Sequence, residues 1–168
     1  SRGEIDELLE PCRTAQQYWS YIHRKTAALL GACCEAGALL AGQAEHWAGL
    51  LREFGEAVGV AFQLTDDVLD YRGSTEKLGK LIGEDFCSET WTLPIILAHE
   101  RGLIAHDWHA LGFDRVQQLL SESGILDEIW GMAEETMNRA RRVLDELPQT
   151  EAELELRRLL DAIAVRQS

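Results

Sequence analysis

Three aspartates, Asp66, Asp67 and Asp70, stand close together near the middle of the chain. If this stretch is helical, with about 100° of rotation per residue, Asp66 and Asp70 lie within about 40° of each other on one face. Like charges at this spacing destabilise a helix by roughly 0.2–0.5 kcal/mol, so the cluster brings no structural advantage. A hard divalent cation removes that cost, because Mg²⁺ binds through one or two carboxylates, several waters and substrate phosphates. The spacing therefore predicts a Mg²⁺ site, with a solvated acidic helix face as the alternative.

The helix face that carries the aspartates also carries small residues. Gly55 and Gly59 fall on it one or two turns earlier, together with Phe62, and Gln63 flanks it. Because glycine has no Cβ, these positions let another group approach the backbone closely. This favours a functional site over a solvated acidic face.

Lysines upstream and downstream could meet an anion. Lys25 lies among apolar residues, which is unusual for lysine. The apolar residues on the same predicted helix face are Tyr18, Ile22, Leu29, Ala32 and Ala36. Either its stem is buried while the ammonium reaches water, or the ammonium points into an interior cavity beside Thr26. Lys77 and Lys80 lie in a glycine-bearing loop directly after the aspartates. Such a loop is by itself an ordinary surface loop, but carboxylates, metal ions and lysines together make a diphosphate site.

These residues need a helical framework to bring them together. The apolar spacing predicts about seven helices and no strand, over residues 3–9, 14–40, 44–71, 94–101, 113–121, 125–147 and 151–165. Helix 14–40 carries Lys25, helix 44–71 carries the aspartates, and a polar loop covers 72–89. Since no linker or repeat divides the chain, we expect a single all-helical domain over residues 1–168.

The composition excludes several classes of protein. The 168 residues hold 16 Lys and Arg against 29 Asp and Glu, which gives a formal net charge of −13. This argues against a nucleic-acid-binding module, which carries a basic face, and against docking on anionic lipid. No stretch of about 18 apolar residues predicts a membrane span, and no signal peptide is visible. The four cysteines form no CxxC pair, as expected for reduced thiols of a cytoplasmic protein.

The order of these motifs resembles that of the trans-isoprenyl diphosphate synthases, the polyprenyl synthetase family, over the C-terminal half of its members. The resemblance rests on several motifs in sequence: Gly3-Glu4, the Lys-Thr motif at Tyr21 to Ala27, the FQxxDDxxD pattern from Phe62 to Asp70, Leu78-Gly79-Lys80, Gly83-Glu84-Asp85, and Thr92-Leu93-Pro94. It implies an all-α bundle of long antiparallel helices around a central cavity, of which this chain would be the C-terminal half. It also implies an Mg²⁺-dependent enzyme of isoprenoid biosynthesis that joins isopentenyl diphosphate to an allylic diphosphate.

The resemblance assigns metal and diphosphate binding residue by residue. It implies that Asp66 and Asp70 flank Mg²⁺, with Asp67 behind them or sharing a ligand water. Lys25 and Lys80 would contact the allylic diphosphate.

The same resemblance assigns the remaining site residues. Gln63 and the Thr26 carbonyl would face the cationic centre of the reaction. Phe62 would lie near the isopentenyl site, and Asp85 would help to hold metal-bound water.

The chain also departs from the family pattern. The first aspartate-rich motif and the basic residues that bind isopentenyl diphosphate are absent, and both belong to the family's N-terminal half. Thr90 stands where the family has a lysine, and Glu89 adds negative charge beside it. We expect the N-terminal half to be supplied by the same polypeptide or by a partner subunit, in a homo- or hetero-oligomer.

Three functions fit this pattern. The chain is half of an active prenyl diphosphate synthase, a non-catalytic subunit that regulates one, or a terpene cyclase-like relative that ionises a longer substrate. We also expect exposed apolar helix faces and no stable lone monomer, because a half-bundle lacks the helices that would cover those faces.

Overall fold

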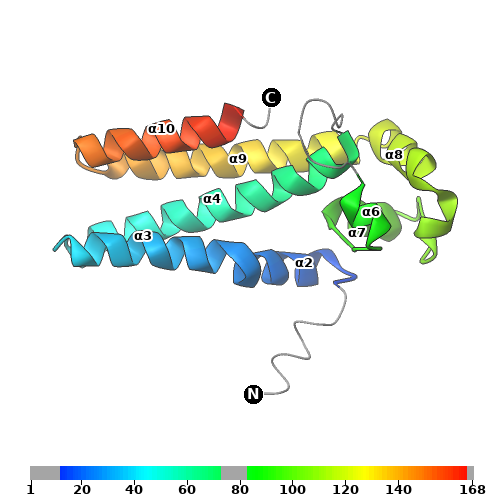
Figure 1. Ribbon diagram of the computed structural model, residues 1–168, viewed down its shortest axis with the longest axis horizontal. Helices are drawn as coiled ribbons and strands as arrows, with labels where there is room; N and C mark the ends of the chain where they lie inside the picture. Colours follow the sequence, from blue (N-terminus) through cyan, green and yellow to red (C-terminus); the bar gives the residue numbers. More distant parts are fainter. Residues whose placement is uncertain (1–11, 73–82, 166–168) are drawn as a thin grey trace, which may run out of the picture. The chain divides into compact units, whose positions relative to one another are not determined.

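The computed structural model describes residues 12–72 and 83–165 of the chain (Figure 1). All regular structure in these residues is helical, which confirms the predicted all-α class. The elements are α2 (Ala15–Ile22), the π-helical turn η1 (His23–Ala27), α3 (Ala28–Leu40), α4 (Glu45–Arg72), α6 (Glu84–Cys87), α7 (Leu93–Glu100), the 3₁₀ turn η2 (Trp108–Leu111), α8 (Phe113–Glu122), α9 (Ile125–Glu146) and α10 (Glu151–Val165).

Most of the predicted helices are present within a residue or two. Pro94 lies in the first turn of α7, as its fixed φ and missing N–H favour. The predicted helix over 3–9 lies outside the described residues. Two short elements were not expected, because α6 and η2 have only four residues each and so show no helical period. Gly83 begins α6 in the left-handed conformation at φ 79°, which glycine adopts without steric cost.

The chain divides into two compact units, each built from two parts of the sequence. One unit takes its described residues from 12–21 and Asp66–Trp130, and the other takes them from Ile22–Thr65 and 131–165. Helices α4 and α9 contribute residues to both units. Among the described residues, no helix combines the length and apolar character needed to cross a bilayer.

The second unit is built from α3 and the larger parts of α4 and α9, with α10. Its core brings residues of α4 and α9 together with Leu160 of α10: Phe54, Ala57, Val58, Ala61, Met137, Ala140, Val143 and Leu144. The Arg139 side chain reaches from α9 to Glu53 on α4 at 2.8 Å. The core residues of α4 and α9 recur at the helical spacing that the sequence predicts. In α10 the apolar spacing also predicts Leu154 and Leu159 on the inward face, and that is wrong, because these side chains are more than half exposed.

Helices α3 and α4 approach each other through glycines. A Cβ added to Gly55 would lie 2.6 Å from the Leu30 carbonyl oxygen, and one added to Gly59 would lie 2.7 Å from the Ala27 Cα. The group that Gly55 admits close to its backbone is therefore helix α3, and the group that Gly59 admits is the last residue of the π-helical turn η1. This corrects the functional interpretation of these glycines drawn from the sequence.

The π-helical turn changes which residues of the long α2–α3 helix are buried. Buried or partly buried positions follow at steps of four, five, four, three and four: Tyr18, Ile22, Ala27, Gly31, Cys34 and Ala38. The step of five falls on η1 (His23–Ala27), because a π turn holds one residue more than an α turn. Lys25 and Leu29 are consequently exposed. The straight helical period predicted from the sequence placed them with Ile22, and that grouping is wrong.

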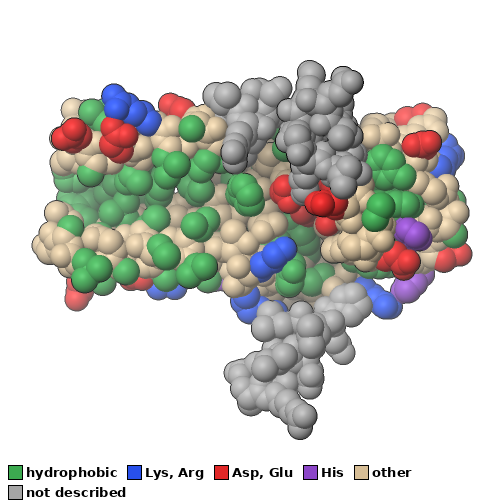
Figure 2. All heavy atoms as spheres, viewed as in Figure 1, with side chains coloured by type: hydrophobic (Ala, Val, Ile, Leu, Met, Phe, Trp, Pro, Cys, Tyr) green, Lys and Arg blue, Asp and Glu red, His purple; other side chains and the backbone are tan. Residues whose placement is uncertain are grey.

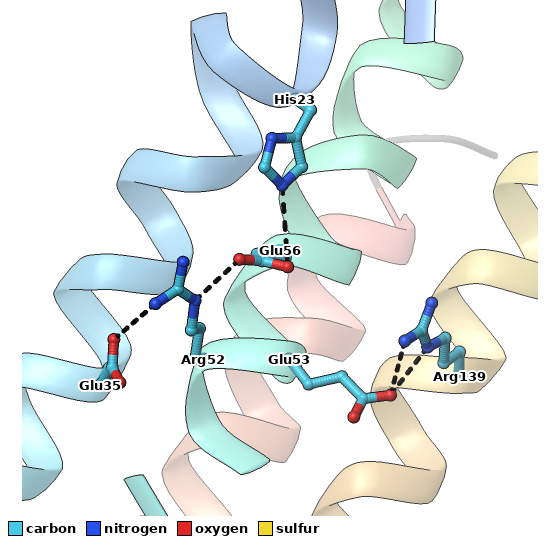
Figure 3. A network of polar contacts seen from close by, with 6 residues as sticks. All are labelled: His23, Glu35, Arg52, Glu53, Glu56 and Arg139. Atoms are coloured by element: carbon cyan, nitrogen blue, oxygen red, sulfur yellow. Dashed lines mark hydrogen bonds and ion pairs between the residues drawn. The ribbon is translucent and has the colours of Figure 1, made fainter. Parts of the chain in front are cut away.

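The contact of α3 and η1 with α4 around Gly55 and Gly59 is called the seam below. A chain of charged contacts links the same elements across this seam (Figure 3). Arg52 donates to Glu35 at 3.2 Å and to Glu56 at 3.0 Å, and the His23 Nε2 atom lies 3.8 Å from Glu56. These side chains are partly exposed, so each pair contributes on the order of 0–1 kcal/mol. The charged contacts add to the stability of the seam, whereas the short distance between the two backbones depends on the glycines.

The first unit has an aromatic core. The Phe86 ring of α6 lies 5.5 Å from the rings of Trp108 and Phe113, and Phe113 stacks on Tyr71 at 6.1 Å. Trp108 and Tyr71 are almost completely buried. These contacts hold the short α6 against the end of α4 and the start of α8.

The glycine seam predicts opposite effects for two substitutions in α4. Gly55→Ala should lower the free energy of unfolding by about 1–3 kcal/mol, because its Cβ would meet backbone atoms of α3 that have no room to move. Gly49→Ala is the matched control, since nothing lies within 4 Å of its Cβ, and it should stabilise the helix by up to about 1 kcal/mol. Urea unfolding of the full chain followed by circular dichroism measures both. Equal effects from the two variants would contradict the seam.

Candidate functional site

Asp70 joins the end of α4 to the start of α6 in the first unit. Its two carboxylate oxygens each accept a backbone N–H, from Glu84 at 3.2 Å and from Asp85 at 3.0 Å. Its backbone carbonyl accepts the N–H of Gly83 at 3.2 Å. The structure thereby brings Asp85, which lies in a separate sequence motif, next to the aspartate cluster.

Asp67 is buried in the same unit. Its Oδ2 atom accepts the Leu93 N–H at 3.3 Å at the start of α7. Burial, together with the negative charges of Asp85 and Asp66, raises the pKa of this carboxyl to about 7. The Tyr18 hydroxyl and the Leu93 N–H act in the opposite direction, because they stabilise the ionised form.

Three buried hydroxyl groups lie close to these carboxylates. Tyr18, Tyr71 and Thr92 have no well-aligned hydrogen-bond partner, although the Tyr18 hydroxyl faces Asp67 and the Tyr71 hydroxyl faces Thr92. Burial raises the pKa of both tyrosines, and the nearby aspartates raise it further. Both tyrosines therefore stay protonated and can act only as neutral donors or acceptors. Neither tyrosine is predicted as a site residue from the sequence, although Tyr71 directly follows Asp70.

Asp66 differs from its two neighbours because it is partly exposed, whereas Asp67 and Asp70 are buried. Nowhere in residues 12–72 and 83–165 do three acidic, histidine or cysteine side chains form a group that could hold a metal ion by themselves. Mg²⁺ needs only one or two carboxylates when water and phosphate complete its shell. The donor set of Asp66 and Asp70 therefore fits a magnesium ion that shares its shell with a phosphate ligand.

Two other predicted site residues meet in the second unit. The Thr26 hydroxyl, in the π-helical turn, donates to the Gln63 Oε1 atom at 2.7 Å. Gln63 is buried, and Phe62 beside it is 47% exposed. The hydrogen bond fixes the orientation of the Gln63 amide.

The remaining predicted residues lie in different surroundings. Lys77 and Lys80 fall outside the described residues. Thr90 is exposed and follows α6; its hydroxyl lies 2.8 Å from the Ser88 hydroxyl, and its N–H donates to the Asp85 carbonyl. Glu89 takes a left-handed backbone at φ 53° where the chain turns toward α7. The position that carries a lysine in the family thus presents a short hydroxyl beside the Asp85 segment.

Comparisons with known proteins agree on one family. The sequence model of the polyprenyl synthetase family matches residues 1–107. Heptaprenyl diphosphate synthase component 2 of Geobacillus stearothermophilus is 34% identical over 161 residues, which are 90% of this chain and 50% of that protein. The chain therefore spans about half the length of the curated relatives that it matches.

Solved structures give the same result for the fold. A decaprenyl diphosphate synthase from Rhodobacter capsulatus superimposes with a TM-score of 0.83 at 30% identity, over 99% of this chain and 56% of that one. A polyprenyl synthase from Caulobacter crescentus CB15, solved with calcium and isoprenyl diphosphate, gives 0.83 at 34% identity, over 99% of this chain and 55% of that one.

The burial of Asp67 predicts a pH dependence of stability. Its pKa is raised from 3.8 to about 7 on folding, so between about pH 4 and pH 7 the folded chain holds a proton that the unfolded chain has lost. The contribution of Asp67 to the free energy of unfolding is therefore largest below about pH 4. It falls as the pH rises from about 4 to 7, by up to about 1.4 kcal/mol per pH unit, and is lost once the pH has passed 7.

The measurement compares the full chain with its Asp67→Asn variant in EDTA, using urea unfolding at pH 5, 6, 7 and 8. The wild type should lose stability relative to the variant as the pH rises, because the asparagine does not titrate. A difference that is constant across these pH values would show that Asp67 has an ordinary pKa.

Proposed function

Because the chain belongs to the polyprenyl synthetase family, we propose that it supplies the C-terminal half of a trans-isoprenyl diphosphate synthase. The observation that carries the proposal is the position of Asp70. It shares one face of α4 with Asp66, and its carboxylate draws Asp85 to the same end of that helix. A cluster of carboxylates beside a helix start suits a metal–diphosphate ligand better than it suits a packed core.

The proposed reaction is a prenyl transfer. The bond between the allylic carbon and the diphosphate oxygen breaks, and the electron pair leaves with the diphosphate. The alkene of isopentenyl diphosphate then forms a bond to the allylic carbon. A proton leaves the new product, with the released diphosphate as the base, and the product is one isoprene unit longer.

In the first unit, Asp66 and Asp70 are proposed to hold Mg²⁺ and Asp85 to hold metal-bound water. Bound Mg²⁺ would neutralise charge on the departing diphosphate. The calcium and isoprenyl diphosphate in the Caulobacter crescentus structure support a cation–diphosphate ligand for this family.

In the second unit, Lys25 is proposed to bind the diphosphate, and Lys80, beyond the described residues, is proposed to do the same. Gln63 and the Thr26 carbonyl are proposed to face the allylic cation, and Phe62 to lie near isopentenyl diphosphate.

The chain is proposed to act with a second half-bundle that carries the first aspartate-rich motif. Among the described residues, helix α3 carries several exposed apolar side chains: Leu29 is 65% exposed and Leu40 is 90% exposed, and Leu30 and Leu39 are exposed as well. Figure 2 shows hydrophobic side chains open to view along this helix. Apolar area of this kind marks an interaction surface. The name of the Geobacillus relative, component 2, fits an enzyme assembled from more than one chain.

A non-catalytic subunit is the second candidate. Thr90 favours it, because a hydroxyl at this exposed position cannot replace the charge of the family lysine in binding diphosphate. The effect of Asp66 on turnover by the complex separates the two functions.

The metal assignment predicts that Asp66→Asn weakens Mg²⁺-dependent binding of pyrophosphate at least tenfold, because the amide lacks the charge that holds the cation. Isothermal titration with pyrophosphate, with and without Mg²⁺, measures this. Asp107→Asn is the control, since Asp107 is an exposed aspartate of the same unit. Unchanged affinity in Asp66→Asn would overturn the assignment.

The half-bundle proposal predicts no prenyl transfer by this chain alone. Turnover should appear when it is mixed with a chain that carries the first aspartate-rich motif, and Asp66→Asn should lower it at least a hundredfold. Radiolabelled isopentenyl diphosphate with an allylic diphosphate gives the assay. Turnover by the isolated chain would contradict the need for a partner, and a complex indifferent to Asp66→Asn would favour the non-catalytic subunit.

A further inference from the structure

Helices α6 and α7 both begin without a cap from their own sequence. The residue before α7 is Thr92, and its side chain makes no capping hydrogen bond; the residue before α6 is Gly83, which has no side chain. The first N–H groups of a helix need acceptors when they are buried. In both cases the acceptor comes from α4, from Asp67 for α7 and from Asp70 for α6.

The capping contact of Asp67 is enclosed by protein. Asp67 is 5% exposed, Leu93 is 1% exposed, and Tyr18, whose hydroxyl faces the carboxylate, is 3% exposed. Pro94 follows Leu93 and has no N–H, so the Leu93 N–H is one of the few donors in the first turn of α7 that need an acceptor from outside the helix. A carboxylate here satisfies that donor and also interacts favourably with the positive end of the helix dipole.

The direction of Asp67 separates it from the proposed metal ligands. Along α4, Asp70 is about 40° from Asp66, but Asp67 is about 100° from it. The Asp67 carboxylate is directed at α7 and α2, while Asp66 reaches the surface. One side chain of the adjacent pair is therefore buried, and the other is partly exposed.

We propose that Asp67 is a positioning residue: it caps α7 from α4, and by holding α2, α4 and α7 together it fixes the rotation of α4 that directs Asp66 outward, without contacting the metal or the diphosphate. This inference rests on the proposed function for the role of Asp66. The capping contact itself does not depend on that function.

The test compares Asp67→Asn, Asp67→Ala and Asp66→Asn in the full chain. Asparagine keeps an oxygen that can accept the Leu93 N–H, whereas alanine does not. Two quantities are measured: the hydrogen-exchange rate of the Leu93 amide by NMR without metal, and the Mg²⁺-dependent affinity for pyrophosphate by titration.

Asp67→Ala should speed exchange of the Leu93 amide at least tenfold and weaken pyrophosphate binding at least tenfold. Asp67→Asn should keep both within about threefold of the wild type, which a metal ligand would not allow. Asp66→Asn should weaken binding at least tenfold and leave the exchange of Leu93 unchanged.

Each contrary result points to a different error. Loss of binding in Asp67→Asn as large as in Asp66→Asn would make Asp67 a metal ligand and overturn the inference. Fast Leu93 exchange or loss of helical circular dichroism in Asp67→Asn would also overturn it, because the acceptor is retained. If Asp67→Ala does not fold, the Asp67→Asn results decide alone. Normal binding in Asp66→Asn would refute the metal assignment and leave the Leu93 measurement valid.

Discussion

A carboxylate inside a protein needs hydrogen-bond donors, and the first unit of this chain meets that need with backbone amides. Asp67 and Asp70 are buried and accept N–H groups from the first turns of α7 and α6. Both short helices depend on this arrangement, because neither is capped by its own sequence. The aromatic contacts of Phe86 depend on it in turn, since α6 carries that ring. The motif that resembles a metal site is thus also the framework of the unit around it.

The long helices could be predicted from the sequence because each buries one apolar face at a regular period. Helix α9 begins at Ile125 as predicted and ends at Glu146, one residue before the predicted end. Helix α10 covers Glu151–Val165, as predicted. The short elements could not be predicted, because four residues do not complete a period. The pairing of Asp67 with Leu93 could not be predicted either, because a contact between residues 26 apart depends on tertiary packing.

Chemistry and family resemblance predict the site residues from the sequence, but they predict the surroundings of Lys25, Gly55 and Gly59 wrongly. A regular α-helical period groups Lys25 with Ile22, and the π-helical turn breaks that period. The lack of a Cβ at Gly55 and Gly59 admits the backbone of α3 and η1 and not a ligand. Neither the π turn nor the neighbouring helix can be predicted from the local sequence pattern. The meeting of Thr26 with Gln63 follows from the same seam, since it joins residues of η1 and α4.

The extra residue in the π-helical turn also constrains how this chain can change in length. Removing one residue from His23–Ala27 would convert the turn to an α turn and leave α3 in register, because the step of five from Ile22 to Ala27 would become a step of four on the same face. Leu29 would then stay exposed, and Gly31 would keep its place beside α4. A deletion within α3 would instead rotate the rest of that helix by about 100°. Related sequences that keep this packing should therefore tolerate the loss of one residue within the turn far more readily than within α3. An alignment gap of one residue at 23–27 would mark a chain with a regular α-helix here and an unchanged contact between α3 and α4.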